Sequence, residues 1–389
     1  MKHKETEAIH RGEGADPSAA PLTTPIYETS TFLFESTAEL ESFQAGTSTK
    51  YLYSRYGNPT VRAVEQKIAA LEGADAAMLL SSGMAAVSTA LFGLLKAGDE
   101  LVCSAAIYGG TLQVIRGYLE KFGVHARFAP IEEFQTPTRL ISEKTRLVWF
   151  ESPINPTLRC IDIAGVAAAC KARGVTSAID NTFASPLNQS PLTLGIDLIM
   201  HSATKYINGH SDVTAGALVG STAMIKSLQP ARKLIGGMID PAAAFAVGRG
   251  IKTIGVRIAR HNQNAMAVAQ YLETHPKVSA VFYPGLASHP DHAVAKKQMT
   301  GGFGGMVTFE AKDGFAGASR FFDRMQVFKR AASLGGVDSL ASLPVLTSQW
   351  GFSDAQLKDA GVTRGMVRLS VGIEHIDDLI ADLQQALNG

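Results

Sequence analysis

The chain has 389 residues, of which 46% are hydrophobic and 18% are charged, and its 36 Lys and Arg residues nearly balance its 35 Asp and Glu residues. A chain of this length and composition is typical of a two-domain globular enzyme and not of a disordered protein. The balanced charge argues against binding to nucleic acid or to an anionic membrane, so we expect small molecules and copies of the same chain as partners.

Residues 1–55 lack a sustained hydrophobic period and contain Pro21, Pro25 and a Thr/Ser-rich run. They are expected to form an extended arm that contacts a neighbouring subunit. From Pro59 the apolar residues fall at helical spacing until Gly73, a typical stop signal, so this segment is predicted to be a helix.

Short apolar runs then alternate with helical segments such as 84–98 and 163–174. This alternation predicts an α/β fold with a mainly parallel central sheet. Ligands of such sheets bind beyond the carboxyl ends of the strands, so the residues after each run are the first candidates for a site. The predicted strands are AAMLL (76–80), ELVCS (100–104), VHARF (124–128), RLVWF (146–150), VTSAID (175–180) and DLIMHS (197–202).

A helical pattern from about 242 to 272 is expected to carry the chain out of the first domain. We therefore expect a ligand-binding domain at 56–245 and a smaller α/β C-terminal domain at 246–389. The elements predicted in the smaller domain are strands at 305–311 and 365–372 and helices at 315–325 and 376–387.

No apolar stretch approaches the roughly 20 residues needed to cross a bilayer, and the N-terminal sequence has charges but no apolar signal core. We therefore expect a cytoplasmic protein. Cys103, Cys160 and Cys170 form no C-x-x-C pair and are expected to be reduced. His289 and His292 have no partner cluster, so no metal is predicted.

Lys205 follows a predicted strand and two hydroxyl residues, Ser202 and Thr204. A lone lysine is usually a solvated surface charge, but Asp180 ends another strand of the same predicted sheet. An aspartate there can keep a pyridinium nitrogen protonated, as pyridoxal 5′-phosphate (PLP) requires, or it can cap a turn. Together these residues predict a PLP site with Lys205 as the reactive amine.

Two further candidates follow neighbouring strands. Gly83 and Met84 open a predicted helix after Ser81-Ser82, where exposed N–H groups favour an anion, although short turns often need such residues. Tyr108 precedes Gly109-Gly110 and could stack on a ligand; taken alone it fits a core or interface tyrosine better.

A series of ordered motifs makes the chain resemble the PLP-dependent enzymes of cysteine and methionine metabolism. That family includes methionine γ-lyase, cystathionine lyases and synthases, and O-acylhomoserine sulfhydrylases. The resemblance covers nearly the whole chain and implies a fold-type-I PLP enzyme. The motifs are Y-x-R-Y-G-N-P-T at 53–60, S-S-G-M at 81–84, Y-G-G-T at 108–111, E-S-P-x-N-P-T at 151–157, D-N-T-F at 180–183, H-S-A-T-K-Y at 201–206, S-L-G-G at 333–336 and R-L-S-V-G at 368–372.

The resemblance implies roles for the candidate residues. Lys205 would form an imine with PLP, Asp180 would bind the ring nitrogen, and Tyr108 would stack on the ring and act as a general acid. Arg368 would receive the substrate carboxylate, assisted by Asn155 and Ser333. The phosphate would be held by Gly83, Met84, Ser202 and Thr204.

The resemblance also implies an oligomer. Tyr53 and Arg55 match residues that reach the cofactor phosphate of a neighbouring subunit. A homodimer is therefore the minimum assembly expected, and the family usually pairs dimers into homotetramers.

Two positions bear on the substrate. Relatives that act on cystathionine commonly carry a charged residue at the positions of Ala332 and Gln113, and neither residue here can bind a second amino acid group. We therefore expect α,γ-elimination of the methionine γ-lyase type, giving a 2-oxo acid, ammonia and a thiol. Gly110, where bacterial methionine γ-lyases usually carry cysteine, leaves cystathionine γ-lyase and γ-replacement (cystathionine γ-synthase or O-acylhomoserine sulfhydrylase) open.

Other readings have less support. A nicotinamide-dependent enzyme should carry G-x-G-x-x-G after its first strand, and the Gly-rich loop at 301–305 comes too late. A non-catalytic protein would not need every expected cofactor contact. Trp350 lies in a segment near the expected entrance of the site that departs from the family pattern, and we expect plain packing there rather than a role in shaping the pocket.

Overall fold

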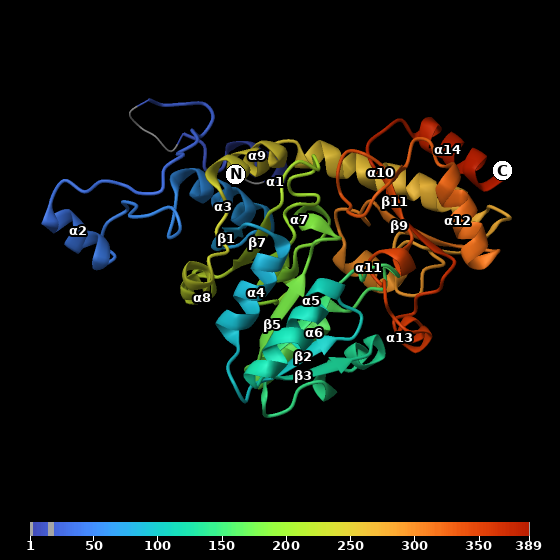
Figure 1. Cartoon of the computed structure of the whole chain (residues 1–389), viewed down its shortest axis with the longest axis horizontal. Coiled ribbons are helices and arrows are strands. Elements are labelled where there is room, and N and C mark those ends of the chain that lie inside the picture. The colour runs from blue at the N-terminus through green and yellow to red at the C-terminus, as the bar shows by residue number, and fades with distance from the viewer. Residues whose placement is uncertain (1–2, 15–18, 389) are drawn as a thin grey trace.

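The computed structural model describes residues 3–14 and 19–388. It contains two β-sheets, and the long helix α10 (Ile254–Glu273) runs from the region of the first towards the second (Figure 1). No helix in the described ranges is both long and apolar enough to cross a membrane.

The large sheet has seven strands in the order β1-β7-β6-β5-β4-β2-β3. All six strands predicted here are present, and the pairs from β6 to β3 are parallel. The seventh strand, β7, was not predicted, and it pairs antiparallel with both β1 and β6. The bounds are β1 (Ala76–Leu80), β2 (Glu100–Ser104), β3 (His125–Ala129), β4 (Thr145–Glu151), β5 (Thr176–Asp180), β6 (Leu198–His201) and β7 (Gly216–Gly220).

Helices cover both faces of this sheet. Along β1, Ala77 and Leu79 pack in the core beneath α3, while Met78 and Leu80 pack in the core beneath α4, as the alternation of side chains along a strand requires. The predicted helix α3 begins after Asn58, whose side chain accepts from the Thr60 N–H. The helices around the sheet are α3 (Pro59–Glu72), α4 (Gly83–Leu94), α5 (Gly109–Val114), α6 (Ile163–Arg173), α7 (Ser185–Asn188), α8 (Thr222–Ile235) and α9 (Pro241–Ile251).

The second sheet has five strands in the order β10-β11-β12-β9-β8. Both strands and both helices predicted in this region are present, whereas the short strands β8, β10 and β11 had no clear sequence signal. The bounds are β8 (Val278–Phe282), β9 (Met306–Ala311), β10 (Lys329–Arg330), β11 (Leu340–Ser342), β12 (Met366–Ser370), α11 (His292–Gln298), α12 (Gly314–Arg324), α13 (Asp354–Asp359) and α14 (Ile376–Asn388).

The prediction of a single long helix from 242 to 272 is wrong, because the helix is interrupted between α9 and α10. At the break, Thr253 Oγ1 donates to the Gly250 carbonyl and accepts from Arg257 Nε. Such local side-chain bonds compete with the helical pattern.

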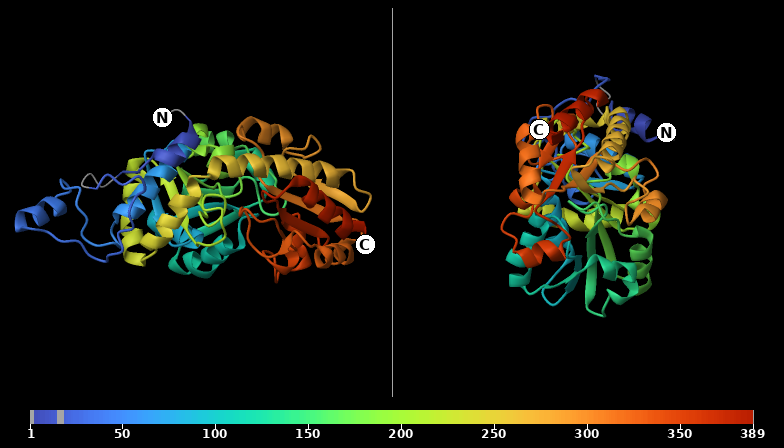
Figure 2. Two further views of the ribbon diagram at one scale, coloured as in Figure 1. Left: turned by 90° about the horizontal axis from the view of Figure 1, so that it is seen from above. Right: turned by 90° about the vertical axis from the view of Figure 1, so that its right-hand side faces the viewer.

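The described residues of the N-terminal segment up to 55 include two short helices, α1 (Lys4–His10) and α2 (Thr37–Gln44). Helix α1 packs against α3 and α10 and buries Ala8. Helix α2 buries no residue and lies at the far end of a segment that extends away from the body (Figure 2).

Short helical turns complete the described structure. They are the π-helical η1 (Ile115–Leu119) and the 3₁₀ turns η2 (Glu120–Phe122), η3 (Ile131–Gln135), η4 (Pro137–Arg139), η5 (Pro191–Leu194) and η6 (Pro344–Leu346).

Candidate active site

A cavity of about 600 Å³ opens at the carboxyl ends of the parallel strands of the large sheet. This volume is typical of a small-molecule site. Residues from the segments before and after β11 and from β12 form its other side. The lining residues are Ser82, Gly83, Met84, Val87, Tyr108, Glu151, Pro153, Asn155, Asp180, Thr182, Phe183, Met200, Ser202, Thr204, Lys205, Thr214, Ala332, Ser333, Leu334, Thr347, Ser348 and Arg368.

Lys205 lies in the turn after β6, and its Nζ donates to Ser333 Oγ at 2.9 Å. Ser333 has a φ of 113°, a strained conformation for a residue with a side chain. Burial lowers the pKa of Lys205, and the positive charge of Arg368 lowers it further. Because the neutral amine is the reactive form, both effects make Lys205 a better nucleophile near neutral pH.

Arg368 lies on β12 and is only 7% exposed. Its guanidinium donates to Asn155 Oδ1 at 2.9 Å and to the Ser333 carbonyl at 3.1 Å. Burial lowers the pKa of Arg368 to about 10, so the side chain stays charged at neutral pH. Among the described residues it forms no ion pair with a carboxylate, which leaves a buried cation facing the cavity.

Asp180 and Glu151 end the adjacent strands β5 and β4, in register. Burial raises the pKa of Asp180, while hydrogen bonds from Thr182 and the electrostatic interaction with His201 oppose this rise. Burial raises the pKa of Glu151 well above its ordinary value, and the negative charge of Asp180 raises it further. Of the two carboxyl groups, Glu151 is therefore the one whose protonated form burial favours more strongly.

An anion cradle lies at the N-terminus of α4. The first N–H groups of a helix have no partner within the helix, and the capping Ser82 side chain accepts only from the Ala85 N–H. The N–H groups of Gly83 and Met84 therefore have no hydrogen-bond partner in the described chain and are open to an anion. A Cβ atom at Gly83 would lie 3.0 Å from Ser202 Oγ, so a side chain would fill the cradle.

Thr204 also borders the cavity, but its hydroxyl is engaged with backbone. Thr204 Oγ1 donates to the Ala215 carbonyl at 3.1 Å and accepts from the Ala215 N–H at 2.9 Å. To donate to an anion, this hydroxyl must turn its proton away from Ala215.

Tyr108 precedes α5 and is 47% exposed at the mouth of the cavity, so it is not a core tyrosine. Its backbone N–H donates to Glu151 Oε1 at 2.5 Å. A Cβ atom at Gly110 would lie 2.6 Å from Tyr108 Cε1 and 2.8 Å from Met84 Sδ. A cysteine at 110 would therefore force the Tyr108 ring to move.

The cavity fits PLP. It holds an amine for the aldehyde (Lys205), a carboxylate for the pyridine nitrogen (Asp180) and an open cradle of N–H groups for the phosphate. The candidates from the large sheet and from the C-terminal segment, which are far apart in sequence, all border this one cavity.

Tyr53 and Arg55 do not line the cavity of their own chain. Arg55 donates to the Lys233 carbonyl at 2.8 Å and lies over the Tyr56 ring at 4.8 Å, and Tyr53 is 40% exposed. Trp350 is 72% exposed, so the expected packing of its side chain is not found within this chain.

Several lining residues were not predicted. Glu151 stands in the E-S-P motif and ends a strand beside Asp180, so the register of parallel strands was the signal that could have found it. Thr182 stands two residues after Asp180 in the D-N-T-F motif. Thr214 and Met200 carry no comparable signal.

Comparison with known proteins confirms the family, fold class and cofactor that the motifs indicate. The model of the Cys/Met metabolism PLP-dependent enzymes matches residues 5–388. An L-methionine gamma-lyase of Pseudomonas putida is 41% identical over 384 residues, covering 98% of this chain and 96% of that protein. Cystathionine gamma-synthase 1, chloroplastic, of Nicotiana tabacum is also 41% identical over 384 residues, covering 98% of this chain and 71% of that protein. The solved structure of metB from Corynebacterium glutamicum has a TM-score of 0.93 and 38% identity, covering 100% of this chain and 98% of that chain. The chain therefore belongs to the PLP-dependent enzymes of Cys/Met metabolism, and it is a carbon-sulfur lyase or synthase with PLP as its cofactor.

Proposed function

We propose that the protein catalyses α,γ-elimination on a sulfur amino acid with a short apolar tail, such as L-methionine. The reaction would consume water and release 2-oxobutanoate, ammonia and methanethiol. One observation carries the proposal: the described residues that line the cavity offer no charged group for a second amino acid group beyond Lys205, Arg368 and the buried pair Asp180 and Glu151.

The charged lining residues are Glu151, Asp180, Lys205 and Arg368. Arg368 suits one α-carboxylate, and the two carboxyl groups are buried at the ends of β4 and β5. Ala332, on the loop before β11, offers no charge for the distal ammonium of cystathionine. A substrate side chain without charges therefore loses the least hydration free energy when it enters this cavity.

We assign the cofactor contacts to the residues of the cavity. Asp180 would accept from the pyridine N–H, and Tyr108 would lie against the ring. Bound through Lys205, PLP supplies an electron sink for the charge that develops when the substrate α-proton is removed. The phosphate would accept hydrogen bonds from the cradle, namely from the N–H groups of Gly83 and Met84 and the hydroxyls of Ser202 and Thr204.

The chain's own groups would move the protons. Arg368, oriented by Asn155 and the Ser333 carbonyl, would fix the substrate so that its α-proton faces Lys205 Nζ. The lowered pKa of Lys205 favours the neutral amine that takes this proton. The Tyr108 hydroxyl, at the mouth of the cavity, would donate a proton to the departing thiolate.

A second candidate is γ-replacement or cystathionine cleavage. It is favoured by the cystathionine gamma-synthase relative, which matches this chain at the same identity as the methionine gamma-lyase does. Both reactions use the same cofactor contacts. The part of the cavity that would hold the substrate side chain therefore determines which reaction occurs.

We further propose that the active protein is at least a homodimer and, by analogy with the family, a homotetramer. The exposed Tyr53 and the neighbouring Arg55, remote from the cavity of their own chain, would contact the PLP phosphate of a neighbouring subunit. Cytoplasmic localisation also remains a prediction.

The deciding experiment measures 2-oxobutanoate release from L-methionine, L-cystathionine and an O-acylhomoserine, each with and without an added thiol, with products identified by mass spectrometry. Methionine turnover without thiol is the expected result. Efficient cleavage of cystathionine alone would overturn the argument from Ala332, and a thioether formed only with thiol would identify a synthase or sulfhydrylase.

A further inference from the structure

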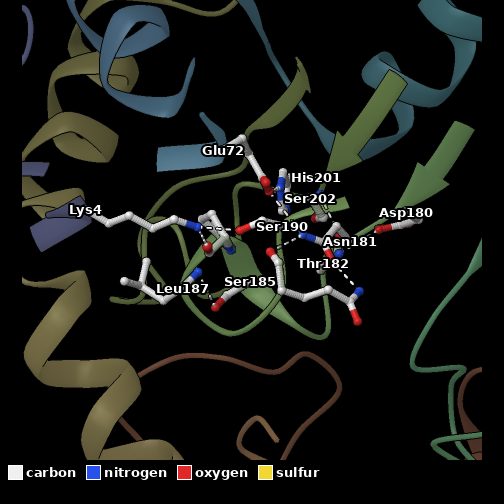
Figure 3. Close-up of polar contacts among 12 residues, drawn as sticks. Lys4, Glu72, Asp180, Asn181, Thr182, Ser185, Leu187, Ser190, His201 and Ser202 are labelled. Atoms are coloured by element: carbon white, nitrogen blue, oxygen red, sulfur yellow. Dashed lines mark hydrogen bonds and ion pairs between the residues drawn. The ribbon is translucent and has the colours of Figure 1, made fainter. Parts of the chain in front are cut away.

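Glu72 contacts residues at the ends of two central strands (Figure 3), and it is not among the residues that line the cavity. It is the last residue of α3 and is 1% exposed. Its Oε1 lies 2.5 Å from Nε2 of His201, the last residue of β6, and accepts from Asn181 Nδ2 at 3.1 Å. These two partners directly adjoin Ser202 and Asp180 in the chain, so one carboxylate oxygen tethers both strand ends.

Asn181 is held at every polar atom of its side chain. Besides the bond to Glu72, its Oδ1 accepts from Gln189 Nε2 at 2.9 Å, and its backbone N–H donates to the Met200 carbonyl at 2.9 Å. Gln189 Nε2 also donates to the Ser152 carbonyl at 2.8 Å. The backbone that carries Asp180 is therefore fixed on its C-terminal side.

A second link ties the same two strand ends on the cavity side. The Thr182 N–H donates to Asp180 Oδ1 at 3.0 Å, and Thr182 Oγ1 accepts from the Ser202 N–H at 2.8 Å. Residues 180–182 and 201–202 therefore form one hydrogen-bonded unit, which Glu72 links on one side and Thr182 on the other.

Charged groups surround this unit. Lys4, on α1, donates to Ser190 Oγ at 2.7 Å and to the Pro186 carbonyl, and it interacts electrostatically with Glu72. His201 interacts electrostatically with Asp180, and Asp180 interacts electrostatically with Glu151.

Glu72 itself is costly to bury. Its Oε2 has no hydrogen-bond partner in the described part of the chain, although the side chain is fully enclosed. A buried carboxylate with an unsatisfied oxygen opposes stability, so packing alone does not explain its place.

We infer that Glu72 and His201 are positioning residues: Glu72, through the imidazole of His201 and the amide of Asn181, holds the Asp180 carboxyl in place. The inference rests on the proposed contact between Asp180 and the pyridine nitrogen of PLP. Neither Glu72 nor His201 lines the cavity, so both act through Asp180.

The test compares Glu72→Gln and His201→Gln with the wild type. Two quantities are measured: the Kd of the apoenzyme for PLP, and the pH dependence of the visible absorption of bound PLP. Asp180→Asn is the reference variant, because it shows how the Kd and the absorption titration change when the Asp180 carboxyl is removed. Asp382→Asn is the matched control, because Asp382 is also a buried carboxylate, accepts from three backbone N–H groups and lies on α14, away from the cavity.

Both variants should raise the Kd for PLP by about tenfold or more, as expected for loss of a hydrogen bond to a charged group. They should also shift the absorption titration in the same direction as Asp180→Asn. Asp382→Asn should lower the Tm without changing the titration.

Two outcomes would overturn the inference. If Glu72→Gln and His201→Gln lower only the Tm and leave the titration at its wild-type position, the pair is structural and the role of Asp180 stands. If Asp180→Asn also leaves the titration unchanged, the proposed contact of Asp180 fails and the inference fails with it. Loss of folding in one variant leaves the other to decide, since each removes one half of the pair.

Discussion

Lys205 Nζ donates to Ser333 Oγ at 2.9 Å, although the two residues lie 128 positions apart. The carbonyl of the same serine accepts from Arg368. The reactive amine and the buried cation thus meet at one residue with a strained backbone, which the C-terminal segment supplies. The site is therefore assembled only when both sheets are in place.

Lys205→Ala should abolish both the visible absorption of bound PLP and substrate turnover, because no other amine lines the cavity as described. The spectrum is recorded after incubation with PLP and removal of the free cofactor. Lys226→Ala, an exposed position on α8, is the control and should keep both properties. Retention of the absorption band in Lys205→Ala would show that another residue holds PLP.

Arg368→Ala should lower kcat/KM by about 30-fold or more, the effect of removing one partner from a buried charge contact. Arg368→Lys should recover only part of this loss, because lysine cannot donate to Asn155 and to the Ser333 carbonyl as a planar fork does. Steady-state kinetics measure the effect. Arg320→Ala, on the exposed face of α12, should leave kcat/KM unchanged.

Ala332→Glu should raise kcat/KM for L-cystathionine relative to L-methionine by about fivefold, or about 1 kcal/mol for a partly exposed ion pair. The new carboxylate would face the distal ammonium of cystathionine. Ala332→Gln has a similar size without the charge and should not change the ratio. An equal change of the kcat/KM ratio in both variants would mean that the size of residue 332, and not its charge, determines which substrate side chain is preferred.

If Arg55 contributes to the active site of a neighbouring subunit, two variants that are each inactive alone should regain activity when they form mixed dimers. Co-expression of Arg55→Ala and Lys205→Ala chains should form mixed dimers with one intact site, giving roughly one quarter of wild-type activity for random pairing. Lys205→Ala with Arg368→Ala is the control, because both residues border the same chain's cavity. Equal activity in both mixtures would place Arg55 outside the neighbour's site.

Stability should fall as the pH drops from about 6.5 towards 4. Burial lowers the pKa of His261 to about 4, from an ordinary value of 6.5, so the unfolded state binds the proton first. The loss should reach about 3 kcal/mol from this histidine alone. It is measured by urea unfolding at several pH values.

His261→Asn should flatten that pH dependence, since an amide can keep the bond to the Val371 carbonyl without titrating. His125→Asn, at an exposed position, should leave the slope as in the wild type. An unchanged slope in His261→Asn would assign the acid sensitivity to other groups.

The large sheet was predictable where the pattern was strong. Buried parallel strands such as AAMLL and RLVWF read as continuous apolar runs bounded by turn residues. The strand GALVG did not stand out because glycine weakens the strand signal; Gly216 is required there, since a Cβ would lie 2.0 Å from the Ser82 carbonyl oxygen. Tertiary contact, and not local preference, selects that residue.

The site was predictable to the extent that its residues follow strands or belong to motifs. Lys205, Asp180 and Arg368 meet in one cavity as expected. Glu72 and His201 were not singled out, because a buried carboxylate at a helix end has no local signal and its partners lie 109 and 129 positions away.

The antiparallel strand β7 also bears on how the protein is made. Within the described residues, β7 is the one strand of the large sheet that pairs with β1. A chain emerging from the ribosome therefore exposes residues 76–80 without a strand partner until 216–220 have been synthesised. An unpaired apolar strand is open to association with other chains, so the large sheet is most vulnerable to aggregation during this interval.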